Sequence, residues 1–165
     1  MCSDDDGTYD SAISNMKYKY LGRKELLLGR HQDIEPIKKG HREGYCLFDG
    51  VQRERVNTFV LECTHKNPNY LYSKQIWYVD PEYWQILYSD KFDKHGELWR
   101  VFDKAGRIVK SVYNDALIGG IGFVLIIDVK RVHATGGFTN YIIGETGNYY
   151  QLDYYTPKTL QKYGY

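Results

Sequence analysis

VNTFVLECTHKNPNYLYSKQIWYVDPEYWQILYSDKFDKHGELWRVFDKAGRIVKSVY, residues 56–113, is the stretch that decides the fold. Short segments rich in β-branched and aromatic residues alternate there with turn clusters at intervals of roughly ten residues, which is typical of an antiparallel meander. The turn clusters are Asn67-Pro68-Asn69, Asp80-Pro81-Glu82, Asp93-Lys94-His95-Gly96 and Asp103-Lys104-Ala105-Gly106. Because glycine adopts the positive φ that tight turns require, both D-K-x-G tetrapeptides predict hairpins.

On the N-terminal side of this stretch, YKYLGRKELLL at residues 18–28 predicts a strand that is interrupted at Gly22. Residues 1–16 are acidic and polar, and we expect them to be a disordered lead-in. The polar segment at residues 31–43 predicts a loop or a short helix.

On the C-terminal side, residues 115–122 predict a glycine-rich joint, and IGFVLIIDVKRVHAT at residues 121–135 predicts the longest strand, buried on both faces at its start. Gly136-Gly137 predicts a bend, and NYIIG and NYYQLDYY predict two more short strands. A short helix is expected at residues 156–162, with Thr156 as its N-cap and Pro157 at its first position.

The composition fits one globular domain, which we place at residues 17–165. The chain has 165 residues, 42% hydrophobic and 26% charged, with a net charge of +1. It holds 17 Tyr, 6 Phe and 3 Trp, and such rings favour half-buried pleated surfaces. We therefore expect a mainly β protein, α+β at most: a curved antiparallel meander or incomplete barrel with one or two short helices. The nearly neutral charge argues against nucleic acid as a partner.

A meander of amphipathic strands has one face that another layer must cover. Where that cover is thin, the face becomes an aromatic-lined groove that suits an acyl chain. We expect the large rings of Trp77, Trp84, Tyr88, Phe92 and Trp99 on this side. The candidates for a hydrophobic binding surface are Trp77, Trp84, Tyr88, Trp99, Phe123, Leu125 and Ile127. The same residues also fit an ordinary core of large side chains, and this alternative stays open.

Motifs for catalysis or metal binding are sparse. The sequence has no G-x-S-x-G elbow, P-loop or H-E-x-x-H motif, and His133 and Asp128 have the odd spacing that places strand residues on opposite faces. Cys63-Thr64-His65 is a lone pair of ligand types and only a weak zinc signal. Cys46 and Cys63 either form a disulfide in an oxidising compartment or remain two small buried thiols. We predict no catalytic residues, no metal and no cofactor.

The longest motif resembles a known family. Residues 72–102, YSKQIWYVDPEYWQILYSDKFDKHGELWRVF, closely resemble the most recognisable stretch of a bacterial family of exported proteins, a domain of unknown function. Shorter segments that also resemble it are YKYLGRKELLL, DVKRVHAT at residues 128–135 and YTPKTLQKYGY at residues 155–165. The family is related in fold to the LolA/LolB-like outer-membrane lipoprotein-sorting proteins. Cys63 and His65 are not part of its motif.

The resemblance implies a curved antiparallel sheet that wraps a hydrophobic cavity, an unclosed barrel with a helical lid. It implies a location in the periplasm or at the periplasmic face of the outer membrane of a Gram-negative bacterium. The chain starts with Met1-Cys2-Ser3-Asp4 and shows no signal peptide, so it is either cytoplasmic or the C-terminal part of a longer exported protein. The resemblance favours the second interpretation.

Three functional hypotheses follow. The first is non-enzymatic binding or transport of a lipid or a lipoprotein acyl chain, with outer-membrane or periplasmic proteins as partners. The second is a structural module whose apolar face packs on a missing N-terminal part or on a second copy, for example a homodimer through an open sheet edge. The third and weakest is a hydrolase that uses His133 or His65 with a carboxylate.

Overall fold

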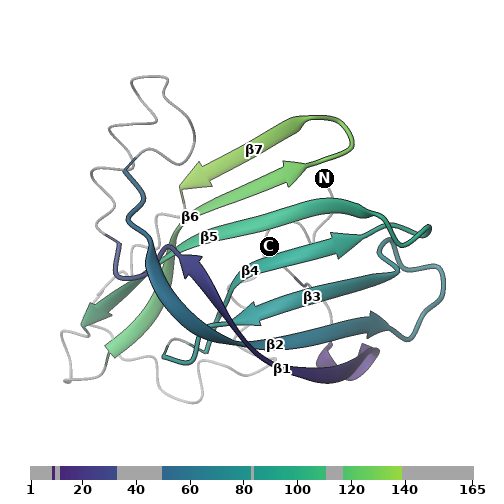
Figure 1. Cartoon of the computed structure of the whole chain (residues 1–165), viewed down its shortest axis with the longest axis horizontal. Coiled ribbons are helices and arrows are strands. Elements are labelled where there is room, and N and C mark those ends of the chain that lie inside the picture. The colour runs from purple at the N-terminus through teal and green to yellow at the C-terminus, as the bar shows by residue number, and fades with distance from the viewer. Residues whose placement is uncertain (1–8, 10–11, 33–49, 83, 111–116, 139–165) are drawn as a thin grey trace, which may run out of the picture.

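A single curved sheet makes up most of the described part of the molecule. The computed structural model describes residues 9, 12–32, 50–82, 84–110 and 117–138. Seven antiparallel strands follow one another in the order β1-β2-β3-β4-β5-β6-β7, so each strand pairs with its neighbours in sequence (Figure 1). One short 3-10 helix, η1 (Ile13–Asn15), precedes the first strand. The expected mainly β antiparallel meander is confirmed.

The strands are β1 (Met16–Leu28), β2 (Glu54–His65), β3 (Lys74–Val79), β4 (Ile86–Phe92), β5 (Leu98–Lys110), β6 (Leu117–Asp128) and β7 (His133–Phe138). The interruption expected in β1 is a bulge, because the pairing with β2 shifts between Tyr20 and Gly22. Gly22 has a φ of 102°, which a residue with a side chain rarely adopts. Within the expected lead-in, η1 is ordered and Tyr9 packs against Trp77.

The hairpin predicted at Asp103-Lys104-Ala105-Gly106 is wrong, because β5 runs through it from Leu98 to Lys110. Asp103 does not cap a turn: it accepts hydrogen bonds from Arg53 Nη1 at 3.0 Å and Nη2 at 2.6 Å. The matching tetrapeptide at residues 93–96 does form a turn, in which the Gly96 amide donates to the Asp93 carbonyl at 3.1 Å. The two segments differ because β6 pairs with β5 along Asp103 to Gly106, whereas Asp93 Oδ1 accepts the amides of His95 and Glu97 and so closes a local turn.

The glycine-rich joint and the single long strand that follows it are also corrected. β6 begins at Leu117 and ends at Asp128, so the glycines at 119, 120 and 122 lie within a strand. The chain then turns over residues 129–132 and returns as β7. The bend predicted at Gly136-Gly137 is wrong, because both glycines are paired with β6 inside this strand. The turn has no Gly or Pro to mark it: Asp128 Oδ1 accepts the Arg131 amide at 3.0 Å, and Val132 takes a φ of 50°.

Other sequence predictions lie outside the described residues. These are most of the loop at residues 31–43, the two short strands after Gly137 and the C-terminal helix at residues 156–162. The described part contains no helix with the length and apolarity needed to cross a membrane.

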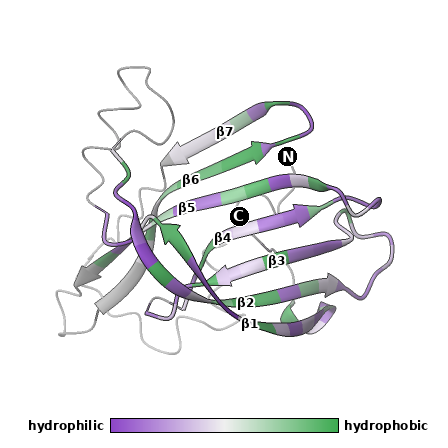
Figure 2. Ribbon diagram, viewed as in Figure 1, coloured by the Kyte–Doolittle hydropathy of each residue, from purple (hydrophilic) through white to green (hydrophobic). Residues whose placement is uncertain are grey.

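The strand register defines two faces of the sheet. One row of paired residues crosses five strands as Val60, Tyr78, Tyr88, Asp103 and Leu125, and we call this side the inner face. The opposite row, on the outer face, is Leu61, Trp77, Ser89, Phe102 and Ile126. Apolar residues are concentrated along β6 (Figure 2), where Phe123, Val124 and Leu125 are buried on both faces. The expected burial at the start of this strand is confirmed.

The sheet closes on itself at one end. Gly29, directly after β1, forms a parallel bridge with Ala105 in β5. The Gly106 amide donates to the Gly29 carbonyl at 2.8 Å, and the Gln32 amide donates to the Gly106 carbonyl at 2.9 Å. Because β1 meets β5 while β6 and β7 continue past it, the described sheet is an incomplete barrel.

A charged cluster fastens this closure. Arg30 Nε lies 2.8 Å from Asp80 Oδ2, and its guanidinium also pairs with Glu82. His31 lies between Glu54 and Glu82, with Nδ1 2.8 Å from Glu54 Oε1 and Nε2 3.3 Å from Glu82 Oε1. The φ of 49° at His31 is unfavourable for a residue with a side chain, and these contacts hold it in place.

Candidate functional site

A pocket of about 290 Å³ lies on the inner face. It is lined by three consecutive leucines and Lys24 of β1, by Tyr78 of β3, and by Tyr88 and Asp90 of β4. The leucines are Leu26, Leu27 and Leu28. The volume is near the lower end of small-molecule sites, which span roughly 300–1,000 Å³. The curvature of β1 positions this wall, because it brings the end of the strand toward β5.

The apolar wall of the pocket is continuous with a buried cluster. Leu28, Val56 and Leu87 form this cluster, and Leu26 and Tyr88 pack against it. Leu28 and Leu87 are fully buried, whereas Leu27 at the strand edge is 61% exposed. The pocket therefore combines a rigid apolar base with an open side at β1.

The polar end of the pocket is built from side chains on neighbouring strands. The Tyr78 hydroxyl donates to Asp90 Oδ2 at 3.0 Å, and the rings of Tyr78 and Tyr88 meet edge to face at 5.5 Å. Lys24 Nζ lies 5.6 Å from the centre of the Tyr78 ring. The pocket thus offers a carboxylate, two phenols and an ammonium group beside the leucines.

Burial perturbs the ionisation of this polar end. It raises the pKa of Asp90, although the hydrogen bond from Tyr78 and the charge of Lys24 oppose the increase. Burial also raises the pKa of Tyr88 to about 12, and the carboxylates of Asp90 and Asp103 add to that effect. The pKa of Tyr78 is raised by burial and by Asp90. Both phenols therefore remain protonated at neutral pH and act as hydrogen-bond donors.

The seven sequence candidates are divided between the two faces. Tyr88 lines the pocket, and Phe123, Leu125 and Ile127 belong to the inner face further along the sheet. Trp77 is on the outer face, 7% exposed, in a cluster with Met16 and Cys63. The expectation that the large rings share one side is wrong, because Trp77 and Tyr88 belong to opposite rows. Whether any of the seven contacts a ligand stays a prediction.

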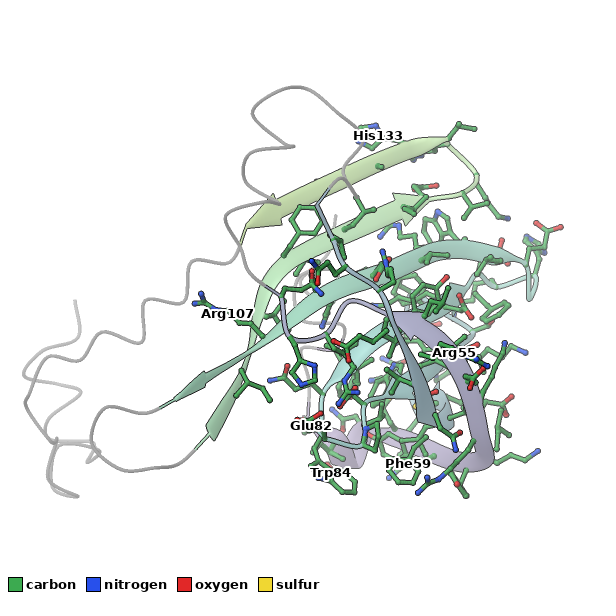
Figure 3. All side chains as sticks on the ribbon, turned by 60° about the vertical axis from the view of Figure 1, so that its left-hand side comes forward. Arg55, Phe59, Glu82, Trp84, Arg107 and His133 are labelled. Atoms are coloured by element: carbon green, nitrogen blue, oxygen red, sulfur yellow. The ribbon has the colours of Figure 1, made fainter. Side chains whose placement is uncertain are left out.

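Trp84 and Trp99 lie away from the pocket. Trp84 is in the β3–β4 connection with a φ of 54°, is 73% exposed and stacks on Phe59 at 5.6 Å (Figure 3). Trp99 donates from Nε1 to Asp128 Oδ2 at 3.2 Å and meets Tyr72 edge to face. Both tryptophans therefore pack against other side chains of this protein.

Of the residues that line the pocket, only Tyr88 was predicted from the sequence. The alternation of Tyr88 and Asp90 on β4 places both on one face, and this signal was available in the sequence. The local sequence does not indicate that Lys24 and the leucines lie near β3 and β4, because this proximity depends on the curvature of β1.

The histidines and cysteine that the sequence singled out have separate environments. His133 Nε2 lies 3.3 Å from Thr135 Oγ1, and His65 Nδ1 accepts the Asn67 amide at 2.9 Å. Cys63 is a buried free thiol whose pKa is raised to about 12, mainly by burial. Cys46 lies outside the described residues. Among the described side chains, no group of three or more His, Cys, Asp or Glu residues is arranged so that it could hold a metal ion.

Two solved structures have a similar fold. One is described as an outer membrane lipoprotein-sorting protein domain from Vibrio parahaemolyticus, with a TM-score of 0.51 and 12% identity over 92% of this chain and 51% of that chain. The other is a DUF1329 family protein from Desulfovibrio piger ATCC 29098, with a TM-score of 0.50 and 18% identity over 89% of this chain and 48% of that one. The chain therefore spans about half the length of each.

An open antiparallel meander that curves around an inner pocket places this chain in the LolA-like, lipoprotein-sorting class of folds. More particularly, the chain belongs to the DUF1329 family of proteins of unknown function, whose family model matches residues 1–161. The resemblance of residues 72–102 to a family of unknown function with this fold is thereby confirmed. No curated protein sequence matches the chain significantly.

Proposed function

We propose that this chain binds or transports a lipid or another hydrophobic molecule without catalysing a reaction. The observation that carries the proposal is the inner pocket, which Leu26 and Leu28 of β1 line together with Tyr78 and Tyr88. This arrangement suits an amphiphile: the leucines contact an acyl chain, and the phenols and Asp90 contact the polar group to which it is attached.

Apolar burial supplies the binding free energy in this proposal. Each buried methylene contributes about 0.8 kcal/mol, so a few methylenes against the leucines offset part of the cost of association. The protonated phenols of Tyr78 and Tyr88 then orient the polar group through hydrogen bonds. No charged anchor is required for the apolar part.

The fold class supports a location in the Gram-negative envelope, in the periplasm or at the periplasmic face of the outer membrane. One of the two similar structures is described as a lipoprotein-sorting domain, and a lipid or lipoprotein acyl chain is the ligand class that we assign here. Periplasmic or outer-membrane proteins are the partners that we propose for delivery.

The experiment is organic extraction and mass spectrometry of the natively purified chain, followed by binding of a fluorescent fatty acid. Leu26→Trp fills the pocket, and Leu21→Trp adds the same ring to an exposed position on the same strand. We expect Leu26→Trp to lose the probe and Leu21→Trp to retain it. Equal binding by the two variants would place the ligand elsewhere.

A second function, as an interaction module, is favoured by one observation. The chain spans about half the length of the similar structures, and the outer edge of β7 is unpaired within the described sheet. An exposed edge of this kind pairs readily with another strand. Light scattering separates the two functions, because an obligate dimer without extractable lipid supports the interaction module.

A further inference from the structure

Three hairpins form a cross-linked rim at one end of the sheet. They are the connections β2–β3, β4–β5 and β6–β7, which lie along the right-hand edge in Figure 1. Lys94 Nζ donates to the Pro68 carbonyl at 2.6 Å and ties the second hairpin to the first. Lys130 Nζ donates to Asp93 Oδ2 at 2.5 Å and to Glu97 Oε2 at 2.6 Å, which ties the third to the second. We call these connections, with η1 beside them, the hairpin rim.

Several large apolar side chains are exposed on this rim. Val132 is 94% exposed at the tip of the β6–β7 hairpin, and Ile13 is 74% exposed in η1. Val129 and Leu71 are 44% and 38% exposed, and Leu98, the first residue of β5 next to the rim, is 37% exposed. The backbone links them, because the Lys66 amide donates to the Asn15 carbonyl and the Val129 amide to the Trp99 carbonyl, both at 2.8 Å. The apolar groups are therefore held along one edge.

The strain at Val132 shows that packing does not explain its position. Its φ of 50° is unfavourable for a β-branched residue, and 94% of its surface is in water. Asn or Gly would fit this turn without strain. The valine thus lowers the stability of the isolated protein. Its apolar side chain contributes favourable free energy only when an apolar environment outside the protein covers it.

The rim also carries an excess of positive charge. Its cations are Lys66, Lys94, Lys130 and Arg131, and its carboxylates are Asp93 and Glu97. Both carboxylates form ion pairs with Lys130. Lys94 donates to a neutral carbonyl, so its charge is not cancelled there. Apolar tips among cations match the two components of an anionic bilayer surface, acyl chains and acidic headgroups.

From this juxtaposition we propose that the hairpin rim docks the protein on the surface of an anionic phospholipid bilayer. Val132 and its apolar neighbours enter the headgroup region, and Arg131, Lys66 and Lys94 contact the lipid phosphates. This inference is independent of the pocket ligand, because the rim and the pocket share no residue.

The test is flotation of the full chain with vesicles of phosphatidylcholine, with or without phosphatidylglycerol. We expect binding only to the anionic vesicles, weakened by added salt. Arg131→Gln should lower the affinity about fivefold, since one cation near such a surface contributes that factor. Val132→Asn should lower it about tenfold through loss of apolar contact. The same Val132→Asn variant should unfold at equal or higher urea, because Asn relieves the strained φ.

Matched controls come from outside the rim. Leu21→Asn removes an apolar side chain that is 47% exposed in β1, and Arg55→Gln removes a guanidinium whose side chain is 75% exposed on β2. Both controls should bind as the unmodified chain does, and so should the pocket-blocking Leu26→Trp. The proposal is overturned if neither vesicle is bound, if neutral vesicles bind equally well, or if the controls lose as much affinity as the rim variants.

Discussion

The amide of Gly106 in β5 donates a 2.8 Å hydrogen bond to the carbonyl of Gly29, which directly follows β1. This bond joins the first strand to the fifth and turns an open meander into an incomplete barrel. The approach is close: a Cβ at Gly29 would lie 3.0 Å from Val51 Cγ1 and 3.3 Å from the Ala105 Cα. The inner pocket depends on this closure, because the wall formed by Leu26, Leu27 and Leu28 immediately precedes it.

Replacement of Gly29 by Val should therefore open the barrel at this end. We expect the free energy of unfolding to fall by about 2 kcal/mol, since side-chain atoms would overlap Val51 and the β5 backbone. Urea denaturation measures the change. The matched control is Gly137→Val in β7, where an added Cβ meets no atom within 4 Å. If Gly29→Val unfolded at the same urea midpoint as the wild type, the close contact between β1 and β5 at Gly29 would not be needed for stability.

Arg53 is predicted to be essential for the unbroken course of β5. Arg53→Met leaves the Asp103 carboxylate, 7% exposed, without its two hydrogen bonds. Loss of one partner from a buried pair costs about 3 kcal/mol, which a thermal or urea melt detects. The double variant Arg53→Met with Asp103→Leu should recover most of that loss, because no charge remains buried. Failure of the second substitution to restore stability would contradict the pairing role.

The rim should weaken in acid. The hydrogen bond from Lys130 is the main factor that lowers the pKa of Asp93 from 3.8 to about 2. A lowered carboxyl pKa stabilises the folded state above the unfolded pKa, and the stability is lost as the pH falls through the folded value. Between about pH 4 and pH 2, the wild type should thus lose more stability than Lys130→Gln. If urea titrations showed that both proteins lose the same stability over this pH range, the Asp93–Lys130 pair would not be the source of the acid sensitivity.

Asp90 should have the opposite effect. Burial raises its pKa above 3.8, so the folded state binds this proton more tightly than the unfolded chain does. Stability therefore decreases as the pH rises from below 3.8 through the raised value, and the penalty is complete at neutral pH. Asp90→Asn keeps an acceptor for the Tyr78 hydroxyl and should raise the urea midpoint at neutral pH but not near about pH 3. A lower midpoint at neutral pH would show that the carboxylate is needed for packing.

Local sequence predicted those parts of the fold in which one segment specifies its own conformation. Strands β1 to β4 follow from runs of β-branched and aromatic residues between turn clusters, and the bulge at Gly22 follows from its glycine. Asp93-Lys94-His95-Gly96 folds as its local chemistry predicts. The family was also readable from the sequence, because the motif at residues 72–102 is long and continuous.

The tertiary structure determined the conformation of those segments in which contacts with a distant part of the chain outweigh the local preference. Asp103-Lys104-Ala105-Gly106 has the composition of a turn but remains extended, because Arg53 bonds Asp103 and β6 pairs along β5. Residues 129–132 have strand composition but form a turn, because Asp128 accepts the Arg131 amide. The pocket belongs to the same category: its leucines lie on β1 and its phenols on β3 and β4, so only the curvature of the sheet brings them together. Sequence alone thus determined strands β1 to β4 and the family, whereas long-range pairing determined the course of β5 to β7, the closure, the faces and the pocket.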